Sequence, residues 1–324
     1  MHRDSVISID MGGTKVLGCV VNSKDGIIAR VKKPTDPTAT RKKYVYQLAE
    51  AVYELIEETQ ISKKKIKAVC LGVPGTVNPL TGIIGLAPNL GLKNFKIKKM
   101  LEAEIPFPVL IENDVNLGAL GIKTFGVGKK SKNMLAVFVG TGIGGGLIID
   151  EKMYRGSNYV AGEIGHMLVE KNGPKCGCGR KGCFEAIASR TAIVNKIVKD
   201  IKSGKRSKLS KLVKSGERIR SKSLSNAVKS GDKVVRRRIK EGCEVIGDTL
   251  ASIANLLNLD MIVLGGGMIE ALDFYMLPLI KKSFSEHVLN DSARGLKIVA
   301  SKLADDAAVY GGIALAEEFL GVKV

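Results

Sequence analysis

Apolar residues occur along this chain in short runs that end at glycine-rich turns, a pattern typical of buried strands. Two stretches, residues 6–26 and 135–152, share one design: an apolar run, a turn of Gly and Thr, a second apolar run and a charged turn. A repeated unit of this kind predicts two similar α/β domains, each opening with a β-hairpin. We place the first domain at residues 1–114 plus about 309–324, and the second at residues 115–308.

The tips of both predicted hairpins have the composition of a phosphate-binding turn. Their residues are Gly12, Gly13, Thr14 and Lys15 in the first and Gly140, Thr141 and Gly142 in the second. Glycine lets several backbone N–H groups converge on an anion, while Thr adds a hydroxyl donor and Lys a positive charge. Asp10, just before the first tip, supplies a carboxylate that can hold Mg²⁺ through water. An ordinary hairpin turn without a ligand is the alternative at each tip.

The uncharged stretch 133–149 invites two other interpretations, and we reject both. Its 17 residues are fewer than the roughly 20 apolar residues that a membrane span needs. The spacing of Gly140, Gly142 and Gly145 matches a dinucleotide fingerprint, but that motif must open a helix, and an apolar strand follows here. The N-terminus also lacks the layout of a signal peptide, so we expect a cytoplasmic protein without a membrane segment.

Two further predicted strands end in residues that suit a ligand. The strand 259–264 leads into Gly265, Gly266 and Gly267, which would permit close approach of a flat ligand such as adenosine. A tight strand-to-helix turn explains the same glycines equally well.

The strand 108–112 leads into Asn113 and Asp114. An amide and a carboxylate side by side can hold sugar hydroxyls, and the carboxylate can take the proton of an attacking alcohol. The pair is also a common helix N-cap, and residues 115–124 look like the start of a helix. Both interpretations are compatible, because a carboxylate at a helix N-terminus stays ionised.

A cluster of soft ligands predicts a structural zinc site. Its members are His166, Cys176, Cys178 and Cys183, with the spacing His-x9-Cys-x-Cys-x4-Cys. Four such donors suit a closed tetrahedral Zn²⁺ with no open position for catalysis. Glu163 and Glu185 would stand on either side of the ion. The remaining cysteines lie in apolar runs and are expected in the core: Cys19, Cys70 and Cys243.

The positive charge is concentrated in one segment. The 324 residues carry a formal net charge of +19, and residues 199–240 hold 16 Lys and Arg against three acidic residues. An anion-binding surface for nucleic acid or polyphosphate is one interpretation. We prefer short helices with solvated basic faces, since charge runs commonly serve solvation. Seven Tyr, eight Phe and no Trp also leave few platforms for stacked bases.

Together these motifs resemble the ROK family, which contains sugar kinases and transcriptional repressors. The resemblance runs nearly from end to end, over residues 10–15, 72–75, 87–89, 112–114, 140–146, 162–166, 176–183 and 305–312. It implies two actin-like, ribonuclease-H-like α/β domains around a cleft, with a zinc loop in the second. It also implies ATP-dependent phosphorylation of a hexose 6-hydroxyl.

The resemblance assigns expected roles residue by residue. Asp114 would be the general base, Asp10 would lie near Mg²⁺, and His166 would both ligate zinc and face the sugar. The sugar would be bound by Asn89, Asn113, Asp114, Glu163, His166 and Glu185, with the Gly75 backbone close by. The phosphates of ATP would lie at Gly12, Gly13, Thr14, Lys15, Gly140, Thr141 and Gly142, and adenosine at Gly265, Gly266 and Gly267.

Substrate identity is the less determined part of the resemblance. Residues 73–76 and 86–90 look most like the glucokinase branch, which would place the protein in glycolysis. N-acetylmannosamine, N-acetylglucosamine and fructose kinases share the other motifs, and polyphosphate is an alternative donor. The family's repressors carry a helix-turn-helix before the first phosphate turn, and Asp10 comes too early for one. A sugar-responsive nucleic-acid-binding regulator is therefore a remote alternative, and a homodimer or homotetramer is expected.

Overall fold

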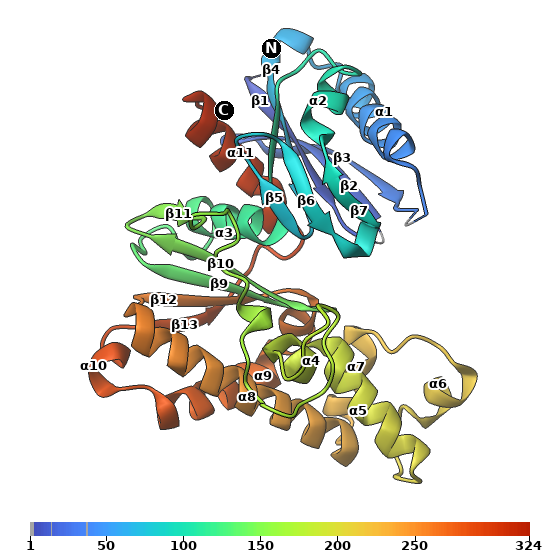
Figure 1. Ribbon diagram of the computed structural model, residues 1–324, viewed down its shortest axis with the longest axis vertical. Helices are drawn as coiled ribbons and strands as arrows, with labels where there is room; N and C mark the ends of the chain where they lie inside the picture. The colour runs from blue at the N-terminus through green and yellow to red at the C-terminus, as the bar shows by residue number, and fades with distance from the viewer. Residues whose placement is uncertain (1–2, 14, 37) are drawn as a thin grey trace. The chain divides into compact units, whose positions relative to one another are not determined.

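A computed structural model describes residues 3–13, 15–36 and 38–324 (Figure 1), so Thr14 of the first predicted turn lies outside the described residues. The chain packs into two compact units. The first comprises Met1–Lys130, Gly146–Ala161 and Asp305–Val324, and the second Ser131–Gly145 and Gly162–Ala304. The first unit thus includes three segments, 115–130, 146–161 and 305–308, from the predicted second domain. Compact units do not test which parts fold independently, so the domain boundaries stay a prediction.

The first sheet has the strand order β3-β2-β1-β4-β8. Its strands are β1 (Ser5–Met11), β2 (Lys15–Asn22), β3 (Gly26–Pro34), β4 (Ile66–Val73) and β8 (Val109–Asn113). The first three strands pair antiparallel, whereas β1, β4 and β8 are parallel.

The second sheet repeats this plan with the order β11-β10-β9-β12-β13. Its strands are β9 (Met134–Val139), β10 (Ile143–Ile149), β11 (Lys152–Tyr154), β12 (Met261–Gly265) and β13 (Lys297–Ala300). The positions of the two sheets correspond strand by strand, and β9, β12 and β13 are again parallel. The predicted duplication and the α/β fold class are therefore confirmed. A strand follows Gly142, as the rejection of a dinucleotide fingerprint requires.

A small third sheet was not predicted from the sequence. Its antiparallel strands are β5 (Thr76–Asn78), β6 (Ile83–Ala87) and β7 (Leu92–Phe95), with the 3₁₀ turn η2 (Pro88–Leu90) between the last two. These strands are too short to give a clear alternation of apolar and polar residues. The sheet begins directly after Gly75 and carries Asn89 on its last connection.

Helices cover both faces of the first sheet (Figure 1). They are α1 (Arg41–Thr59), α2 (Ile97–Glu102), α3 (Asp114–Thr124) and α11 (Asp306–Leu320), with a 3₁₀ turn η1 (Lys63–Lys65). Ile7 and Ile9 of β1 are fully buried in the cluster that includes α1. Ser8, which points to the opposite face, donates a hydrogen bond to the carbonyl of Ala308 in α11 at 3.4 Å.

Two glycines explain why α3 belongs to the first unit. A Cβ added at Gly121 would lie 1.9 Å from the carbonyl oxygen of Ala307, and one at Gly311 would lie 1.8 Å from that of Leu117. Helices α3 and α11 therefore touch through backbone atoms, at a distance that no side chain fits. Since α11 also packs on β1 and β4, it fixes α3 to the first sheet.

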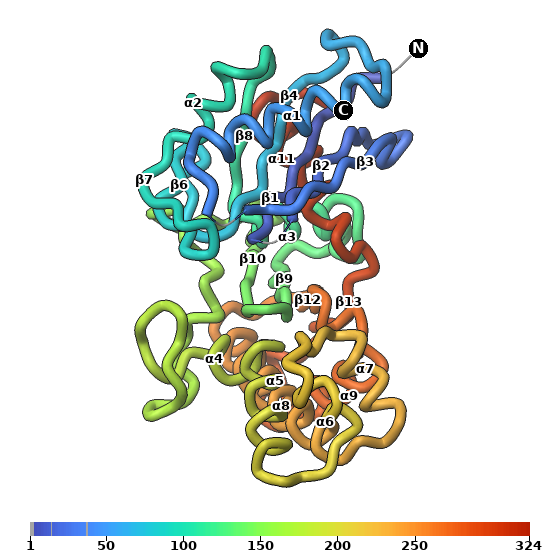
Figure 2. The backbone as a smooth tube through the Cα atoms, turned by 90° about the vertical axis from the view of Figure 1, so that its right-hand side faces the viewer, coloured from blue at the N-terminus to red at the C-terminus, as the bar shows by residue number. Residues whose placement is uncertain are grey.

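The helices of the second unit follow the second glycine turn. They are α4 (Phe184–Ala188), α5 (Arg190–Lys202), α6 (Ser210–Ser215), α7 (Ser221–Lys229), α8 (Lys233–Leu257), α9 (Gly267–His287) and α10 (Asn290–Ala293), with the 3₁₀ turn η3 (Ile164–His166). Helix α9 packs on β9, β12 and β13, and α8 packs on α9. The chain between η3 and α4 loops outward beside α4 (Figure 2). Among the described residues, no helix combines the length and apolarity needed to cross a membrane.

The basic segment 199–240 forms the predicted short helices at α6 and α7, but its last residues begin the 25-residue helix α8, and part of its charge is neutralised within the unit. The buried carboxylate of Asp200 accepts hydrogen bonds from Lys205, Arg237 and Arg238 at 2.7 to 2.9 Å. Such a cluster uses three cations to hold the end of α5 against α8.

Candidate active site

The carboxyl ends of three parallel strands place the predicted carboxylates of the first unit together. In the register of the sheet, Asp10 of β1 pairs with Gly72 of β4, and Gly72 pairs with Glu112 of β8. Asp114 follows two residues after Glu112 and begins α3. Parallel strands in α/β sheets present ligand sites at this edge.

The proximity of Asp114 changes the acid–base chemistry of Asp10. Burial raises the pKa of Asp10 to about 7, and the negative charge of Asp114 adds to the rise. Lys15 acts in the opposite direction. Asp10 therefore gains or loses its proton near neutral pH, a behaviour that a carboxylate acquires when like charge is close and water is scarce.

The turn between β1 and β2 is closed by its own backbone. The N–H of Gly12 donates to the carbonyl of Lys15 at 2.9 Å, and the hydroxyl of Thr35 donates to the carbonyl of Gly12 at 2.7 Å. Gly13 lies beside Asn89, since a Cβ added there would be 3.5 Å from the Asn89 Cβ. The structure thus brings the expected phosphate turn and a predicted sugar-binding residue together.

Lys15 has a partner that the sequence analysis did not foresee. Its ammonium group forms an ion pair with the carboxylate of Asp305, immediately before α11. The turn thus carries its positive charge already held in place by a carboxylate 290 residues later in the chain.

Asn113 acts as the N-cap of α3, which confirms the structural interpretation of the Asn–Asp pair. Its Oδ1 accepts from the N–H groups of Val115 at 2.9 Å and Asn116 at 3.1 Å, while its Nδ2 donates to the carbonyl of Gly75 at 2.9 Å. An amide nitrogen has two hydrogens, so one donor of Asn113 remains for a ligand. Asp114 occupies the first turn, where the helix dipole favours its charge.

Gly75 is held by a close backbone approach. It has a φ of +92°, and a Cβ there would lie 2.2 Å from the carbonyl oxygen of Leu86. Only glycine fits this position between β4 and the small sheet. The contact fixes the carbonyl that orients Asn113.

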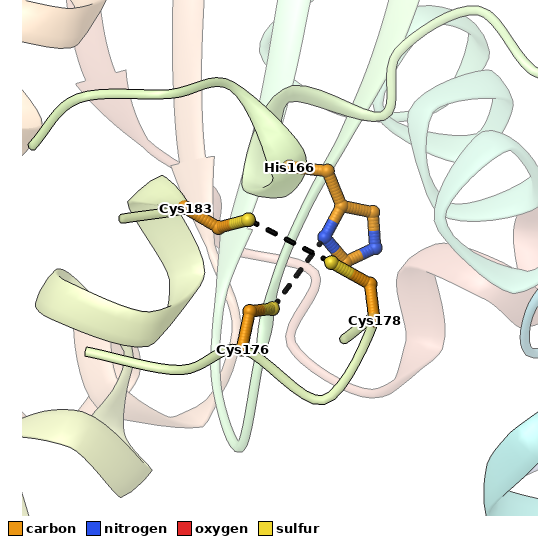
Figure 3. Close-up of side chains that lie close together, drawn as sticks. All are labelled: His166, Cys176, Cys178 and Cys183. Atoms are coloured by element: carbon orange, nitrogen blue, oxygen red, sulfur yellow. Dashed lines mark hydrogen bonds between the residues drawn. The ribbon is translucent and has the colours of Figure 1, made fainter. Parts of the chain in front are cut away.

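In the second unit, the four predicted zinc ligands converge. The ligand atoms of His166, Cys176, Cys178 and Cys183 all lie within 4.8 Å of one another. Figure 3 shows the four side chains pointing toward one another, with Nδ1 of the His166 ring facing Cys176 at 3.8 Å. Three thiols and one imidazole at these distances suit a tetrahedral Zn²⁺. With Nδ1 turned to Cys176, Nε2 is the ring nitrogen that is left to meet another group.

Glu163 and Glu185 flank this cluster, as predicted. Glu163 lies 3.8 Å from Nε2 of His166, and Glu185 lies 3.8 Å from the sulfur of Cys176. Burial raises the pKa of Glu163, His166 lowers it, and the charge of Glu185 raises it. The negative charges of Glu163 and Glu185 therefore repel each other within one small region of the second unit.

The second glycine turn is tied to the cysteine loop by Glu185. Its Oε2 accepts a hydrogen bond from the N–H of Ile143 at 3.0 Å. A Cβ added at Gly142 would lie 2.1 Å from the same oxygen. Glycine at 142 thus makes room for the carboxylate that joins the turn to the metal ligands.

Thr141 of this turn is fixed by α5. Arg190 donates to the Thr141 hydroxyl at 2.7 Å and to the Ser221 hydroxyl at 3.3 Å, and Thr191 donates to the Thr141 carbonyl at 2.7 Å. Ser221 lies near Gly267, where an added Cβ would be 3.9 Å from its oxygen. Arg190 thereby connects the expected phosphate and adenosine regions.

A pocket that the sequence analysis missed opens beside Thr141. It has a volume of about 530 Å³ and is lined by Thr141, Arg190, Thr191, Val194, Asn195, Val198, Lys202, Leu212, Val213, Gly216, Glu217, Arg218 and Ile219. Burial and the nearby charge of Arg218 lower the pKa of Arg190. Apolar side chains line this pocket together with the cations Arg190, Lys202 and Arg218, a combination that suits a flat ring joined to an anion. Part of the basic segment therefore forms a pocket wall.

The triple glycine forms the tight strand-to-helix turn that was the alternative interpretation. Gly265 ends β12, Gly266 has a φ of +84°, and α9 begins at Gly267. A Cβ at Gly266 would lie 2.8 Å from the carbonyl oxygen of Val139. Packing against β9 alone thus accounts for glycine at 266, and a ligand role for this turn stays a prediction.

This architecture is the fold of the ROK sugar kinases. The ROK family glucokinase from Streptomyces griseus, solved in complex with glucose and AMPPNP, superposes with a TM-score of 0.85 at 31% identity, covering 97% of this chain and 99% of that chain. The sequence model of the ROK family matches residues 6–319, and the chain belongs to this family.

Relatives of known sequence include both enzymes and regulators. The chain is 32% identical over 307 residues to the glucokinase of Halalkalibacterium halodurans, covering 94% of this chain and 93% of the relative. It is 30% identical over 311 residues to the xylose repressor of Caldicellulosiruptor bescii, covering 96% of this chain and 77% of the repressor.

Proposed function

We propose that this ROK protein is an ATP-dependent sugar kinase that phosphorylates the 6-hydroxyl of a hexose, with glucose as the first substrate to test. The observation that carries the proposal is the position of the Asp114 carboxyl group at the start of α3, next to Asn113, whose side chain is bonded to the carbonyl of Gly75. Likeness to glucokinases over nearly the whole chain supports glucose. Fructose, N-acetylglucosamine and N-acetylmannosamine are the alternatives.

The donor would be held by the two glycine turns. The proposed phosphate ligands are Gly12, Gly13, Thr14, Lys15, Gly140, Thr141 and Gly142. We assign adenosine to the pocket beside Thr141, together with Gly265, Gly266 and Gly267, because Arg190 connects the two regions. Asp10 is the proposed outer ligand of Mg²⁺, which would neutralise the phosphates and favour the ionised form of the Asp10 carboxyl.

The family resemblance also supplies the proposed sugar ligands. The proposed ligands are Gly75, Asn89, Asn113, Asp114, Glu163, His166 and Glu185. His166 would bind zinc through Nδ1 and a sugar hydroxyl through Nε2, and Asn113 would use its one remaining N–H. Zinc would have a structural role, since three thiolates and one imidazole leave no open coordination position.

The reaction would proceed by in-line transfer. Asp114 takes the proton of the sugar 6-hydroxyl while that oxygen attacks the γ-phosphorus and the bond to the β-phosphate oxygen breaks. The products are sugar 6-phosphate, ADP and the proton held on Asp114. Positioning and charge neutralisation supply most of the acceleration in such reactions.

Release of ADP by the purified protein tests this function. The assay contains Mg-ATP and one sugar at a time: glucose, mannose, fructose, N-acetylglucosamine or N-acetylmannosamine. Turnover highest with glucose supports a glucokinase, and turnover only with an N-acetyl sugar keeps the mechanism but changes the substrate. No turnover with any sugar, with either ATP or polyphosphate as donor, rejects the kinase.

The xylose repressors among the relatives make a sugar-responsive regulator the second candidate. Exposed cations of α6 and α7 would then contact a phosphate backbone. Retention on double-stranded DNA that weakens steeply with salt and changes with added sugar would support it. Sedimentation in the same buffers would test the expected dimer or tetramer.

A further inference from the structure

A buried carboxylate lies directly before the proposed catalytic pair. Glu112, the penultimate residue of β8, is 1% exposed. Its Oε1 accepts from the backbone N–H of Asn113 at 2.9 Å and from the side-chain amide of Asn116 at 3.1 Å. Glu112 therefore grips the chain on both sides of Asp114, at the point where strand becomes helix.

One arginine holds the other oxygen of this carboxylate. Nε of Arg155 donates to Oε2 of Glu112 at 2.6 Å, and the Arg155 side chain is only 12% exposed. A buried carboxylate needs such a partner, because a charge removed from water without compensation is strongly destabilising. Both carboxylate oxygens of Glu112 thus have partners inside the first unit.

Arg155 is itself anchored at the end of α11. Its two terminal nitrogens donate to the two carboxylate oxygens of Glu318 at 2.6 and 2.9 Å, and its guanidinium lies 5.5 Å from the centre of the Phe319 ring. The planar guanidinium makes three directed contacts at once, a geometry that lysine cannot reproduce. The result is a continuous chain of contacts from Glu318 through Arg155 and Glu112 to the backbone of Asn113.

We infer that Arg155 is a positioning residue for phosphoryl transfer: through Glu112 it fixes the backbone of Asn113 and the side chain of Asn116 and thereby the direction of the Asp114 carboxylate. The inference rests on the proposed role of Asp114 as the base. A displacement of about 1 Å at a reacting group can lower a rate on the order of 100-fold, so a remote anchor of this kind has a measurable effect on turnover.

Steady-state kinetics of Arg155→Met and Arg155→Lys test the inference. Both variants should lower kcat, Arg155→Met by roughly 10- to 100-fold, with KM for sugar and ATP changed less than about threefold. The matched control is Arg30→Met, which removes the two-point pair of Arg30 with Asp306 at 2.7 and 2.8 Å, at the opposite end of α11. Rates are expressed per folded molecule, as measured by circular dichroism.

A double-mutant cycle shows whether Arg155 acts through Glu112. If it does, Glu112→Gln combined with Arg155→Met should be no slower than Arg155→Met alone, within about threefold. Independent effects that multiply would overturn the inference, as would an unchanged kcat in Arg155→Met or an equal loss in Arg30→Met.

Hydrogen exchange separates this inference from the proposed function. Arg155→Met should speed amide exchange at Asn113 and Asn116, and Arg30→Met should not. Unchanged exchange in Arg155→Met would show that Arg155 does not fix the chain through Glu112, whatever the activity of the wild-type protein. If exchange is faster in Arg155→Met but the wild-type protein phosphorylates no sugar, Arg155 fixes the chain through Glu112 without a role in phosphoryl transfer. If Arg155→Met does not fold, Arg155→Lys decides the question: it keeps a cation near Glu112 but loses the two-point pair with Glu318, so it should still lower kcat and speed exchange at Asn113, and unchanged values would overturn the inference.

Discussion

Glu185 and Ile143 are joined by a 3.0 Å hydrogen bond from the backbone N–H of Ile143 to Oε2 of the carboxylate. The other oxygen of Glu185 lies 3.8 Å from the sulfur of Cys176. One side chain therefore connects the metal-ligand cluster to the glycine turn that follows β9. A substitution in the metal-ligand cluster should therefore affect the glycine turn, and a substitution in the turn should affect the cluster.

Gly142→Ala should destabilise the second unit. The added Cβ would stand 2.1 Å from Oε2 of Glu185, so the carboxylate must leave and the N–H of Ile143 loses its partner. We expect a loss of about 1–3 kcal/mol in the free energy of unfolding, measured by urea denaturation. Gly140→Ala is the matched control, because no atom lies within 4 Å of its added Cβ. Equal losses in the two variants would contradict the role of Glu185.

Zinc should be bound at about one ion per chain through the Cys3His cluster. Cys178 is exposed, so Cys178→Ser removes a metal ligand with little change in packing. This variant should lose zinc, measured by atomic emission, and its Tm should fall as it does for wild type after chelation. Cys243→Ala, at a buried thiol outside the cluster, should lower Tm but keep its zinc. Full zinc content in Cys178→Ser would reject the ligand set.

Asp114→Asn should lower kcat on the order of 100- to 10,000-fold, the usual contribution of a general base. The amide keeps the shape of the side chain at the start of α3, so the dissociation constant for sugar, measured by calorimetry, should change little. Asp291→Asn, an exposed carboxylate in α10, serves as the control for the same chemical change. Near-normal turnover in Asp114→Asn would remove Asp114 from its proposed role.

The protonation of Asp10 should make stability depend on pH. Burial, reinforced by Asp114, raises the pKa of Asp10 to about 7, so the folded protein keeps a proton that the unfolded chain releases above about pH 4. The contribution of Asp10 to the free energy of unfolding should therefore decrease as pH rises from about 4 to about 7, and it should stay level above about pH 7.

Asp10→Asn should remove this decline and raise stability at pH 7 on the order of 2 kcal/mol, allowing for partial solvent screening. Urea denaturation at intervals between pH 4 and pH 8 measures the slope. Asp36→Asn should leave this slope unchanged. Hydrogen bonds from Thr38, the larger cause, and from Lys43 lower the pKa of Asp36 to about 2, so this carboxyl group does not titrate between pH 4 and pH 8. An identical slope in wild type and Asp10→Asn would show that Asp10 is ionised throughout.

Local patterns predicted the parts of the site that short segments encode. The strands around Asp10 and Gly140, the start of α3 and the converging cysteines all depend on residues close in sequence. Glycine spacing and ligand spacing are local signals, and the repeated hairpin revealed the duplicated sheet order. Asn113 was correctly interpreted as a cap for the same reason.

Contacts between residues far apart in the chain could not be predicted from the sequence. Lys15 pairs with Asp305, 290 residues away, and Arg155 lies 43 residues from Glu112 and 163 from Glu318. No periodicity specifies such contacts, because they depend on which strands and helices meet. The raised pKa of Asp10 is of this kind, since it arises from burial and from the approach of Asp114 at the start of α3. The pocket beside Thr141 was missed because its wall lies in a segment interpreted only by its charge.

The packing of α11 against α3 and β1 has a consequence for the order of events during synthesis. Ribosomes make the chain from its N-terminus, and domains generally fold as they emerge. The first sheet emerges early, yet the helix that covers one of its faces is made after the whole second unit. The contacts of Ser8 with Ala308 and of Gly121 with Ala307 cannot form until α11 has been synthesised. The half of the protein that is translated first is thus the half completed last, and until then its uncovered face needs protection from other nascent chains.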